Sequence, residues 1–477
     1  MTKSKKDLII LSLGKALQVI IALVSIRILT ELLSEQEVGN YYLLLTVLTL
    51  FNFAFLNPLG QYYGRHLVKW EHSKNLLNAT NVLLFLRISA IVFSLFVAFT
   101  VYQIFGYEKY YTLNEFLLFI FVSLVAGTHG VLLNAVNTLG DRIKFISYVV
   151  LTLVVGLILS LVIVHFIDKS GIGWLYGVAI SQIIFSFTLY RYIVKNNNFS
   201  LEKVKIAFQK EYVKKIAIFI IPVTITLFLQ WGQNQSYRFI IEAKYSLEIL
   251  AYIGVGLAVS GAIFSAVESL ATQFYNPIYI RQITHANKQD RAKAWNDLAS
   301  YMIPIYLVLA VYVILLAPYI TNLLVAEKFY EAYIYAMFGV GIEFFRVITN
   351  LVYTVSQSEV KTNTTILPYT IGFIVTMSSL YFFDMSESNW LIPLFVGLSN
   401  GLICLLLFIS MKKLLDIKVD VLGLIKSFFL ASPLLLVLLV ENTQELFQTI
   451  LIIGISGLYF LFLVYIIAQK RILGENR

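Results

Sequence analysis

Charged residues are scarce in this chain of 477 residues: 13% are Asp, Glu, Lys or Arg, whereas 59% are hydrophobic. A soluble globular protein carries roughly 25% charged residues. So little charge cannot cover the surface of a protein of this size, so lipid is the expected solvent. The polar–apolar alternation of membrane β-strands is also lacking, because Leu117–Val125 and Val149–Val164 are nearly continuous apolar runs. The sequence therefore predicts an all-α polytopic membrane protein.

Cysteine occurs once, at Cys404 inside an apolar run, which excludes an intrachain disulfide and a cysteine-based metal site. The sequence has no Gly-rich phosphate loop, which argues against ATP hydrolysis by this chain. It has no His/Asp/Glu cluster with metal-ligand spacing and no loop long enough for a soluble catalytic domain. No cofactor is therefore expected, and coupling to a proton or sodium gradient stays open as the source of work.

Apolar runs near 20 residues recur along the whole chain, and each is long enough to cross a hydrocarbon core of about 30 Å. The first is interpreted as an uncleaved span because Lys15 and Arg27 interrupt it and no small-residue cleavage site follows. About fourteen spans are predicted, at approximately 8–31, 38–62, 76–103, 113–138, 144–167, 171–193, 213–240, 248–275, 299–323, 331–356, 363–383, 389–411, 422–440 and 446–468.

Basic residues are distributed unevenly between the two sides of these spans. With Met1 inside, 27 of the 36 Lys and Arg residues lie in cytoplasmic segments, and the outer loops hold only four beside fourteen acidic residues. This is the pattern of the positive-inside rule, so both termini are predicted to be cytoplasmic. The net charge of +9 belongs to these segments, so a nucleic-acid partner is not expected.

The chain repeats itself weakly at an offset of 211 residues: Arg27-Ile-Leu-Thr-Glu31 matches Arg238-Phe-Ile-Ile-Glu242, and Tyr41 matches Tyr252. The repeat unit has six spans, an even number, so the two halves have the same orientation in the membrane. The predicted organisation is a six-helix bundle at 1–195, a cytoplasmic amphipathic linker at 196–212, a second six-helix bundle at 213–412, and two additional helices with a tail at 413–477.

Charged residues inside the spans carry the functional signal, because a charge at the bilayer centre costs at least ~2.5–3.5 kcal/mol. Five are basic and two acidic, an excess of +3 that favours an anion such as a carboxylate or a diphosphate: Lys15, Arg27, Arg87, Arg238 and Arg346 against Glu268 and Glu343. Arg87 lies roughly 16 Å deep and needs an anion or an internal partner, whereas Lys15, Arg27 and Arg238 could instead snorkel to the interface.

The acidic residues have structural alternatives as well. Glu343 and Arg346 are three residues apart and can form an ion pair on one helix face. Glu268 has no local partner, so it is the best candidate for a residue that responds to a proton or another cation.

Amide side chains also cluster within the spans. Gln230–Ser236 follows Pro222 in the seventh span and includes Gln233 and Asn234, a composition unfavourable against lipid tails. Other spans hold amides that could bind sugar, although hydrogen bonding between helices is the alternative for each: Asn52, Asn57, Asn134, Asn137 and Gln273. His129 is expected to be a packed core residue.

Two stretches resemble bacterial polysaccharide flippases, the O-antigen and capsule repeat-unit translocases of the multidrug/oligosaccharidyl-lipid/polysaccharide exporter superfamily. The first is the opening span with its exit, from Lys15-Ala-Leu-Gln to Val38-Gly-Asn-Tyr41. The second is the seventh span with its exit, Ile221-Pro222 followed by Tyr237-Arg238. An Asp often precedes the arginine in that family, but here the residue is Tyr237.

The resemblance implies two six-helix bundles that alternate between inward-open and outward-open states in the bacterial cytoplasmic (inner) membrane. The substrate would be an undecaprenyl-diphosphate-linked oligosaccharide for lipopolysaccharide O-antigen or capsule, moved from the cytoplasmic to the outer leaflet. A polysaccharide polymerase and chain-length machinery would act as partners beside the lipid bilayer. The head group would be held by Arg87, Arg27, Arg238, Lys15, Gln233 and Asn234, and gating or coupling would fall to Glu268, Glu343 and Arg346.

Three other functions remain as alternatives. A multidrug or toxin exporter of the same architecture would favour an acidic cavity, which the excess of +3 opposes. A flippase for peptidoglycan precursor has the same sequence features. A membrane-embedded polysaccharide polymerase or acyltransferase would need a sizeable outer loop or buried His/Asp chemistry, and the sequence shows neither.

Overall fold

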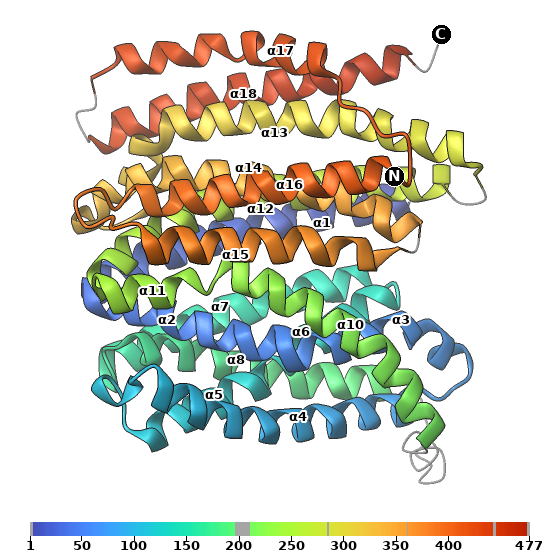
Figure 1. Ribbon diagram of the computed structural model, residues 1–477, viewed down its shortest axis with the longest axis vertical. Helices are drawn as coiled ribbons and strands as arrows, with labels where there is room; N and C mark the ends of the chain where they lie inside the picture. Colours follow the sequence, from blue (N-terminus) through green and yellow to red (C-terminus); the bar gives the residue numbers. More distant parts are fainter. Residues whose placement is uncertain (1–2, 196–209, 284–285, 360, 442–444, 475–477) are drawn as a thin grey trace. The chain divides into compact units, whose positions relative to one another are not determined.

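The computed structural model describes residues 3–195, 210–283, 286–359, 361–441 and 445–474 (Figure 1). Residues 196–209 of the predicted linker at 196–212 lie outside the described residues. Regular structure in the described ranges is entirely helical: α1 (Lys3–Leu32), α2 (Glu35–Phe51), η1 (Asn52–Leu56), α3 (Asn57–His72), α4 (Leu76–Ile104), η2 (Tyr107–Lys109), α5 (Leu113–Ala126), α6 (Thr128–Thr138), α7 (Arg142–Phe166), α8 (Gly171–Val194), α10 (Lys210–Asn234), α11 (Tyr237–Lys244), α12 (Leu247–Ile283), α13 (Lys288–Leu324), η3 (Glu327–Ala332), α14 (Tyr333–Ser358), η4 (Thr362–Thr365), α15 (Ile366–Phe382), α16 (Leu391–Lys412), α17 (Val421–Leu430), η5 (Ser432–Leu439) and α18 (Leu446–Gly474).

Fourteen of these helical stretches are long and apolar enough to cross a membrane, which confirms the predicted all-α polytopic fold. The junction between the fifth and sixth spans falls between Phe166 and Gly171, as expected. Several spans are not simple α-helices. The second is interrupted by the π-helix η1, the seventh breaks between α10 and α11, and the thirteenth ends in the 3-10 helix η5. Such breaks are tolerated at membrane depth where neighbouring helices or a cavity satisfy the freed backbone groups.

The chain divides into two compact units. Unit 1 consists of Met1–Ala22 with Leu32–Ala243, and unit 2 consists of Leu23–Glu31 with Lys244–Arg477. The first helix therefore contributes to both units, and the seventh span belongs to unit 1. The domain prediction of 1–195, 213–412 and 413–477 rests on a sequence repeat. A division into compact units does not test that repeat, so the domains stay a prediction.

Small residues bring helices into close contact inside each unit. In unit 1 a Cβ on Gly177 of α8 would overlap the backbone of Ser160 on α7, whose hydroxyl donates to Trp174 O over 2.7 Å. In unit 2 a Cβ on Gly339 of α14 would meet the Ser260 hydroxyl of α12. Close approach through small residues is how helices associate in lipid, where the hydrophobic effect gives no drive. Small residues thus bring α7 close to α8, and α12 close to α14, the two helices that carry Glu268 and Arg346.

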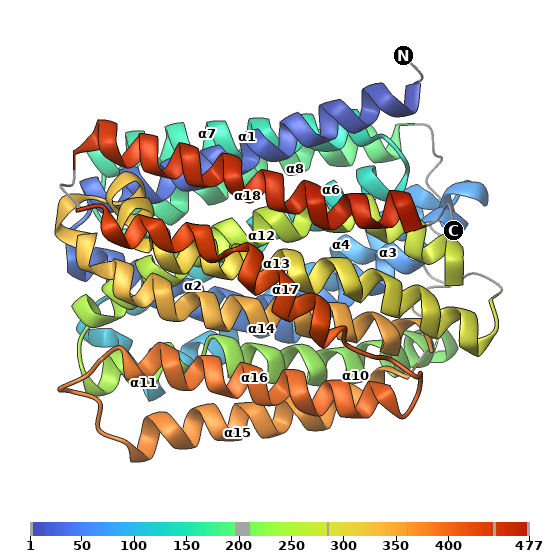
Figure 2. The ribbon, with the colours of Figure 1, turned by 90° about the horizontal axis from the view of Figure 1, so that it is seen from above.

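The core of unit 1 gathers where α3, α4, α6 and α8 meet: Tyr63, Leu67, Leu76, Leu83, Leu132, Ala135, Val136, Leu189 and Ile193. In unit 2 the helices α17 and α18 both pack against α13, and the three run side by side in Figures 1 and 2. Polar residues between the spans begin several helices. Thr112 and Glu115 form a capping box on α5, and Asp141 and Ser170 cap α7 and α8.

Candidate functional site

The second span breaks at the level of η1, and the cause lies in its sequence. Asn57 N–H donates to Asn52 O five residues back, and Pro58, at the start of α3, has no N–H to continue the ladder. The fourth span breaks as well, between α5 and α6 at Gly127. The two breaks meet, because a Cβ on Gly127 would lie 3.2 Å from Asn52 Oδ1.

A cavity of about 700 Å³ opens beside these breaks, wholly inside unit 1, and is called here the unit 1 cavity. Its walls come from α2, η1, α3, α4, α6 and α10. Glycines and amides make up much of the lining: Gly60, Gly64, Gly127, Gly130, Asn52, Asn57, Gln61 and Asn134. Two cationic side chains, Arg65 and Arg87, also line it. Such a volume is typical of a site for a small organic ligand.

Arg87 of α4 is the deepest charge of this cavity and only 2% exposed. Its Nη1 donates to Leu56 O over 3.2 Å, and its Nε donates to Thr128 Oγ1 over 3.3 Å. Its Nη2 has no hydrogen-bond partner among the described residues and would lie 3.6 Å from a Cβ on Gly127. No carboxylate of the described chain forms an ion pair with Arg87. The predicted internal partners therefore exist, but they are neutral and leave the positive charge and one donor unsatisfied.

Three of the residues predicted to hold the head group lie beside the α10–α11 break: Gln233, Asn234 and Arg238. Arg238 Nη1 lies 3.4 Å from both Tyr42 O and Thr46 Oγ1, and its Nε is buried without a partner. Gln233 is completely buried, and neither amide atom has a partner in the described part of the chain. Asn234 differs, because its amide donates to Gln230 O within the same helix. These residues belong to unit 1, but they are not part of the lining of the unit 1 cavity.

The two candidates on α1 belong to different units. Lys15 is in unit 1, and its amine donates to Gln18 Oε1 over 3.1 Å. Arg27 is in unit 2, where it donates to the carbonyls of Asn322 and Val325 at the end of α13 and pairs with Glu31 at 3.6 Å. The C-terminal carbonyls of a helix favour a cation, so Arg27 has a structural role at this position.

Unit 2 gathers the three predicted coupling residues into one cluster. Arg346 Nε donates to Glu343 Oε2 over 2.7 Å, which confirms the predicted pair on α14. Arg346 Nη1 donates to Glu268 Oε2 on α12 over 2.8 Å. Asn350 donates to the other oxygen of Glu268, also over 2.8 Å. Glu268 has no partner near it in sequence, as expected, but its tertiary partners lie 78 and 82 residues away.

The charged residues behind the predicted excess of +3 are divided unequally between the two units. Lys15, Arg87 and Arg238 of unit 1 make no ion pair with a carboxylate in the described residues. Both acidic residues of the spans lie in unit 2, around Arg346. Unit 1 therefore offers uncompensated positive charge inside its spans, and the cluster of unit 2 has one cation for two carboxylates.

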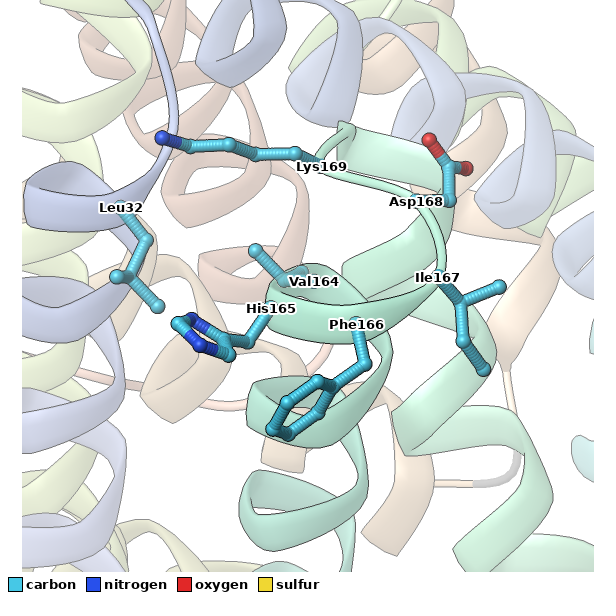
Figure 3. Close-up of a pocket in the computed structure, with 7 residues that line it drawn as sticks. All are labelled: Leu32, Val164, His165, Phe166, Ile167, Asp168 and Lys169. Atoms are coloured by element: carbon cyan, nitrogen blue, oxygen red, sulfur yellow. The ribbon is translucent and has the colours of Figure 1, made fainter.

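A second cavity of unit 1, of about 380 Å³, lies where α7 ends (Figure 3). The His165 ring lies beside Leu32, and Lys169 extends across the same side, while Ile167 and Asp168 point the other way. Phe166 and Ile167 are each 77% exposed. These side chains have the mixture of apolar surface and charge found at a membrane interface. The cavity contains no buried charge, so the unit 1 cavity is the stronger candidate for an anion.

The structure places the predicted amides differently. Asn52, Asn57 and Asn134 line the unit 1 cavity, whereas Asn137 does not, and the Gln273 side chain falls outside the described structure. His129 is a packed core residue, as expected, with its Nε2 3.1 Å from Thr152 Oγ1.

Gly127 and Thr128 were not identified from the sequence as part of the site. The helix-breaking residues near them, Pro58 and the pair Gly127 and Gly130, were the available signal. They mark interrupted helices at membrane depth, where irregular backbone usually borders a cavity.

No protein-family model matches the sequence, and no curated protein matches it. Among solved structures, the chain is similar to the lipid II flippase MurJ in an inward closed conformation, with 14% identity and a TM-score of 0.69 over 97% of this chain and 99% of that one. It is also similar to an inward-facing multidrug resistance MATE family transporter of the MOP superfamily, with 10% identity and a TM-score of 0.60 over 89% and 95%.

A third similar structure is a MOP superfamily transporter from Pyrococcus furiosus, described as having a binding pocket of reverse polarity. Its identity is 12% and its TM-score 0.53, over 90% of this chain and 96% of that one. At such identities the similarity establishes the fold, and the substrate has to be argued from the site itself. This chain therefore has the membrane fold of the MurJ and MATE transporters.

Proposed function

We propose that this protein is a transporter of the multidrug/oligosaccharidyl-lipid/polysaccharide exporter superfamily that flips a lipid-linked oligosaccharide. The substrate is an O-antigen or capsule repeat unit on undecaprenyl diphosphate, moved from the cytoplasmic to the outer leaflet by alternating access. The observation that supports this most directly is Arg87, a buried guanidinium with a free donor and no carboxylate partner in a cavity of about 700 Å³.

The chemistry of that cavity suits a phosphate. A guanidinium stays charged and presents several donors in a plane, and it binds phosphate oxygens more strongly than neutral donors do. The free Nη2 of Arg87 supplies such a donor, and it faces Gly127, on which a Cβ would lie 3.6 Å from it. A buried charge without an anion is costly, so an anionic head group lowers the free energy of this state more than a neutral one does.

A purely structural role for Arg87 explains only part of the geometry. The bonds to Leu56 O and Thr128 Oγ1 tie the broken second span to the broken fourth. Two neutral hydroxyl or amide donors of similar length would make those bonds without placing a charge in the membrane. The charge itself and the third donor point to a ligand.

The other site residues enter the proposal with different support. At the α10–α11 break, Arg238 and Gln233 have buried polar atoms without partners, which favours a contact with substrate. Lys15 and Asn234 are proposed to contribute to the head-group site of unit 1. Arg27 is proposed separately to contact the substrate from its place in unit 2. The cluster of Glu268, Glu343 and Arg346 is proposed to couple transport to protons or sodium.

The similarity to a lipid II flippase supports a lipid-linked substrate but leaves the glycan open. A flippase of peptidoglycan precursor is the nearest variant of this proposal. The proposed partners are the polysaccharide polymerase and chain-length machinery, which would consume the flipped repeat unit at the outer leaflet.

A second candidate function is the export of organic cations. It is favoured by the cluster of unit 2, where two carboxylates surround one arginine, and by the shared fold of MATE transporters. The uncompensated arginines of unit 1 oppose it.

The test measures lipid-linked oligosaccharide and its leaflet exposure in the wild type, a gene deletion, and deletion strains that carry Arg87→Ala, Arg87→Lys or Arg191→Ala. Arg191 is a matched control, because it lies on α8 over the Phe187 ring and outside the cavity lining. We expect the intermediate to accumulate on the cytoplasmic leaflet in the deletion and in both Arg87 variants. Arg87→Lys should fail as well, because an ammonium cannot make the several bonds that the planar guanidinium makes.

Two outcomes would overturn the proposal. Normal flipping with loss of surface polymer would place the protein after translocation, as a polymerase. Unchanged lipid and polymer with new drug sensitivity would establish the cation exporter.

A further inference from the structure

Beyond the anion site at Arg87, the unit 1 cavity continues along two helices that present small and polar residues to it. On α3 the lining residues Asn57, Gln61 and Gly64 are spaced four and three apart. Gly127, the N-cap of α6, is followed on α6 by Gly130 and Asn134, at spacings of three and four residues. These spacings place each set on one helix face. The cavity is therefore a trough between two polar stripes that begin beside Arg87 and run away from it.

Two glycines of the trough leave real space. A Cβ built on Gly64 or on Gly130 meets no atom within 4 Å, whereas a Cβ on Gly60 would lie 2.9 Å from Val131 Cγ2. Glycine destabilises a helix relative to alanine, so each glycine in a helix needs a reason. Close helix packing supplies one for Gly60 but not for Gly64 and Gly130. Both of the latter border the cavity, and any side chain at either position would narrow it.

The amides along the trough keep hydrogen-bonding capacity. The only bond among them joins Gln61 Nε2 to Asn57 Oδ1 at 3.2 Å, which leaves the Asn57 amide group and the Gln61 oxygen for a ligand. Asn134 is exposed, and its side chain lines the cavity. An amide both donates and accepts, so it can pair with a hydroxyl in either direction. At seven residues past Gly127, Asn134 is about 10 Å along α6 from the anion site.

We infer that the trough between Asn57, Gln61 and Asn134 is a sugar subsite that binds the hydroxyl-rich part of the ligand next to its phosphate and selects which glycan is carried. The inference rests on the proposed function, because it takes the phosphate at Arg87 as its fixed end. A site built to hydrogen-bond hydroxyls discriminates strongly against a ligand that lacks them, since its own polar groups are then left unpaired. Selectivity for the glycan thus lies with the amides, and affinity for the diphosphate with Arg87.

The experiment uses the full-length protein in lipid nanodiscs and measures Kd by native mass spectrometry. The ligands are undecaprenyl diphosphate and the same lipid carrying one glucose, one galactose or one N-acetylglucosamine. The variants are Asn134→Leu, Gly130→Leu, Arg87→Gln and the control Gly454→Leu. Gly454 lies on α18, where a Cβ also meets nothing within 4 Å, so this control adds the same side chain away from the cavity.

We expect the wild type and Gly454→Leu to bind at least one glycosylated lipid about tenfold more tightly than the bare diphosphate, as two or so added hydrogen bonds would give. Asn134→Leu and Gly130→Leu should lose that gain and keep the Kd for bare undecaprenyl diphosphate within about twofold. Arg87→Gln should weaken all four ligands together.

The failures of the two proposals are distinguishable. If bare and glycosylated lipids bind the wild type equally, or if Asn134→Leu and Gly130→Leu keep the gain, the sugar subsite is refuted and the flippase proposal stands. If the wild type does not bind undecaprenyl diphosphate at all, the proposed function fails, and the subsite fails with it.

Discussion

Replacing Arg346 by methionine tests whether the cluster of unit 2 is held together by one shared cation. The side chains of Arg346, Glu268 and Glu343 are 29%, 17% and 16% exposed, so water screens them only partly. Arg346→Met removes both ion pairs and leaves two carboxylates in contact with helices at membrane depth. Removing one partner of a buried pair costs about 3–5 kcal/mol, mainly because the other charge stays buried and unpaired.

The same reasoning predicts a rescue. In the triple variant Arg346→Met, Glu268→Gln, Glu343→Gln the cluster has no charged side chain. Replacing a whole buried ionic group by neutral residues is often neutral or stabilising. The stability of the triple variant should therefore return to near that of the wild type. The stability of Arg346→Lys should lie between those of Arg346→Met and the wild type, because a single ammonium cannot reproduce two bonds made through different nitrogens.

The assay is thermal unfolding of the purified protein in detergent. For a cooperative unit of 150–250 residues, a loss of about 3–5 kcal/mol corresponds to a fall in Tm of roughly 6–20 °C. Lys418→Met is the matched control, because it breaks a pair with Asp416 in which both side chains are 68% exposed. Such a pair contributes about 0–1 kcal/mol, so Tm should hardly move. An Arg346→Met protein as stable as the wild type, or a triple variant no more stable than Arg346→Met, would refute the reasoning.

Three further predictions concern the ends of the helices and the orientation of the chain. Tyr192 donates to Asp141 over 2.6 Å, and this bond together with Lys144 holds the pKa of Asp141 below its usual range. Its stabilising contribution is thus complete above about pH 4 and is lost as pH falls through the lowered pKa. Because Asp141 also caps α7, Asp141→Ala should cost about 0.5–2 kcal/mol at pH 7, and Asp141→Asn much less, as measured by Tm. A hydrogen bond to Glu242 raises the pKa of Lys109, so the charged lysine stabilises the fold. Glu242→Gln should therefore lower Tm at pH 8. The difference in Tm between the variant and the wild type should disappear as pH rises beyond about 10.4 through the raised pKa of Lys109. Because the only native cysteine is buried, a membrane-impermeant maleimide should label Glu387→Cys in intact cells and Lys413→Cys only after permeabilisation. The reverse pattern would invert the predicted topology.

The number of spans follows from the sequence for a physical reason. In lipid every backbone N–H and C=O must be satisfied within its own segment, so a long apolar run becomes a helix whatever surrounds it. The pair of Glu343 and Arg346 was predictable in the same way, because residues three apart on a helix are neighbours. Both are local properties, fixed within a single turn or a single span.

Tertiary structure alone decided which helix faces meet, and hence which charges are paired. The excess of +3 in the spans can be counted in the sequence. The sequence does not show that Arg346 binds Glu268 from 78 residues away, or that Arg87 has only neutral partners. The breaks near Pro58 and Gly127 bring Leu56 and Thr128 to Arg87 from 31 and 41 residues away. Each apolar face fits many others, so the sequence determines that these helices exist, and only their packing determines that a cationic cavity lies between them.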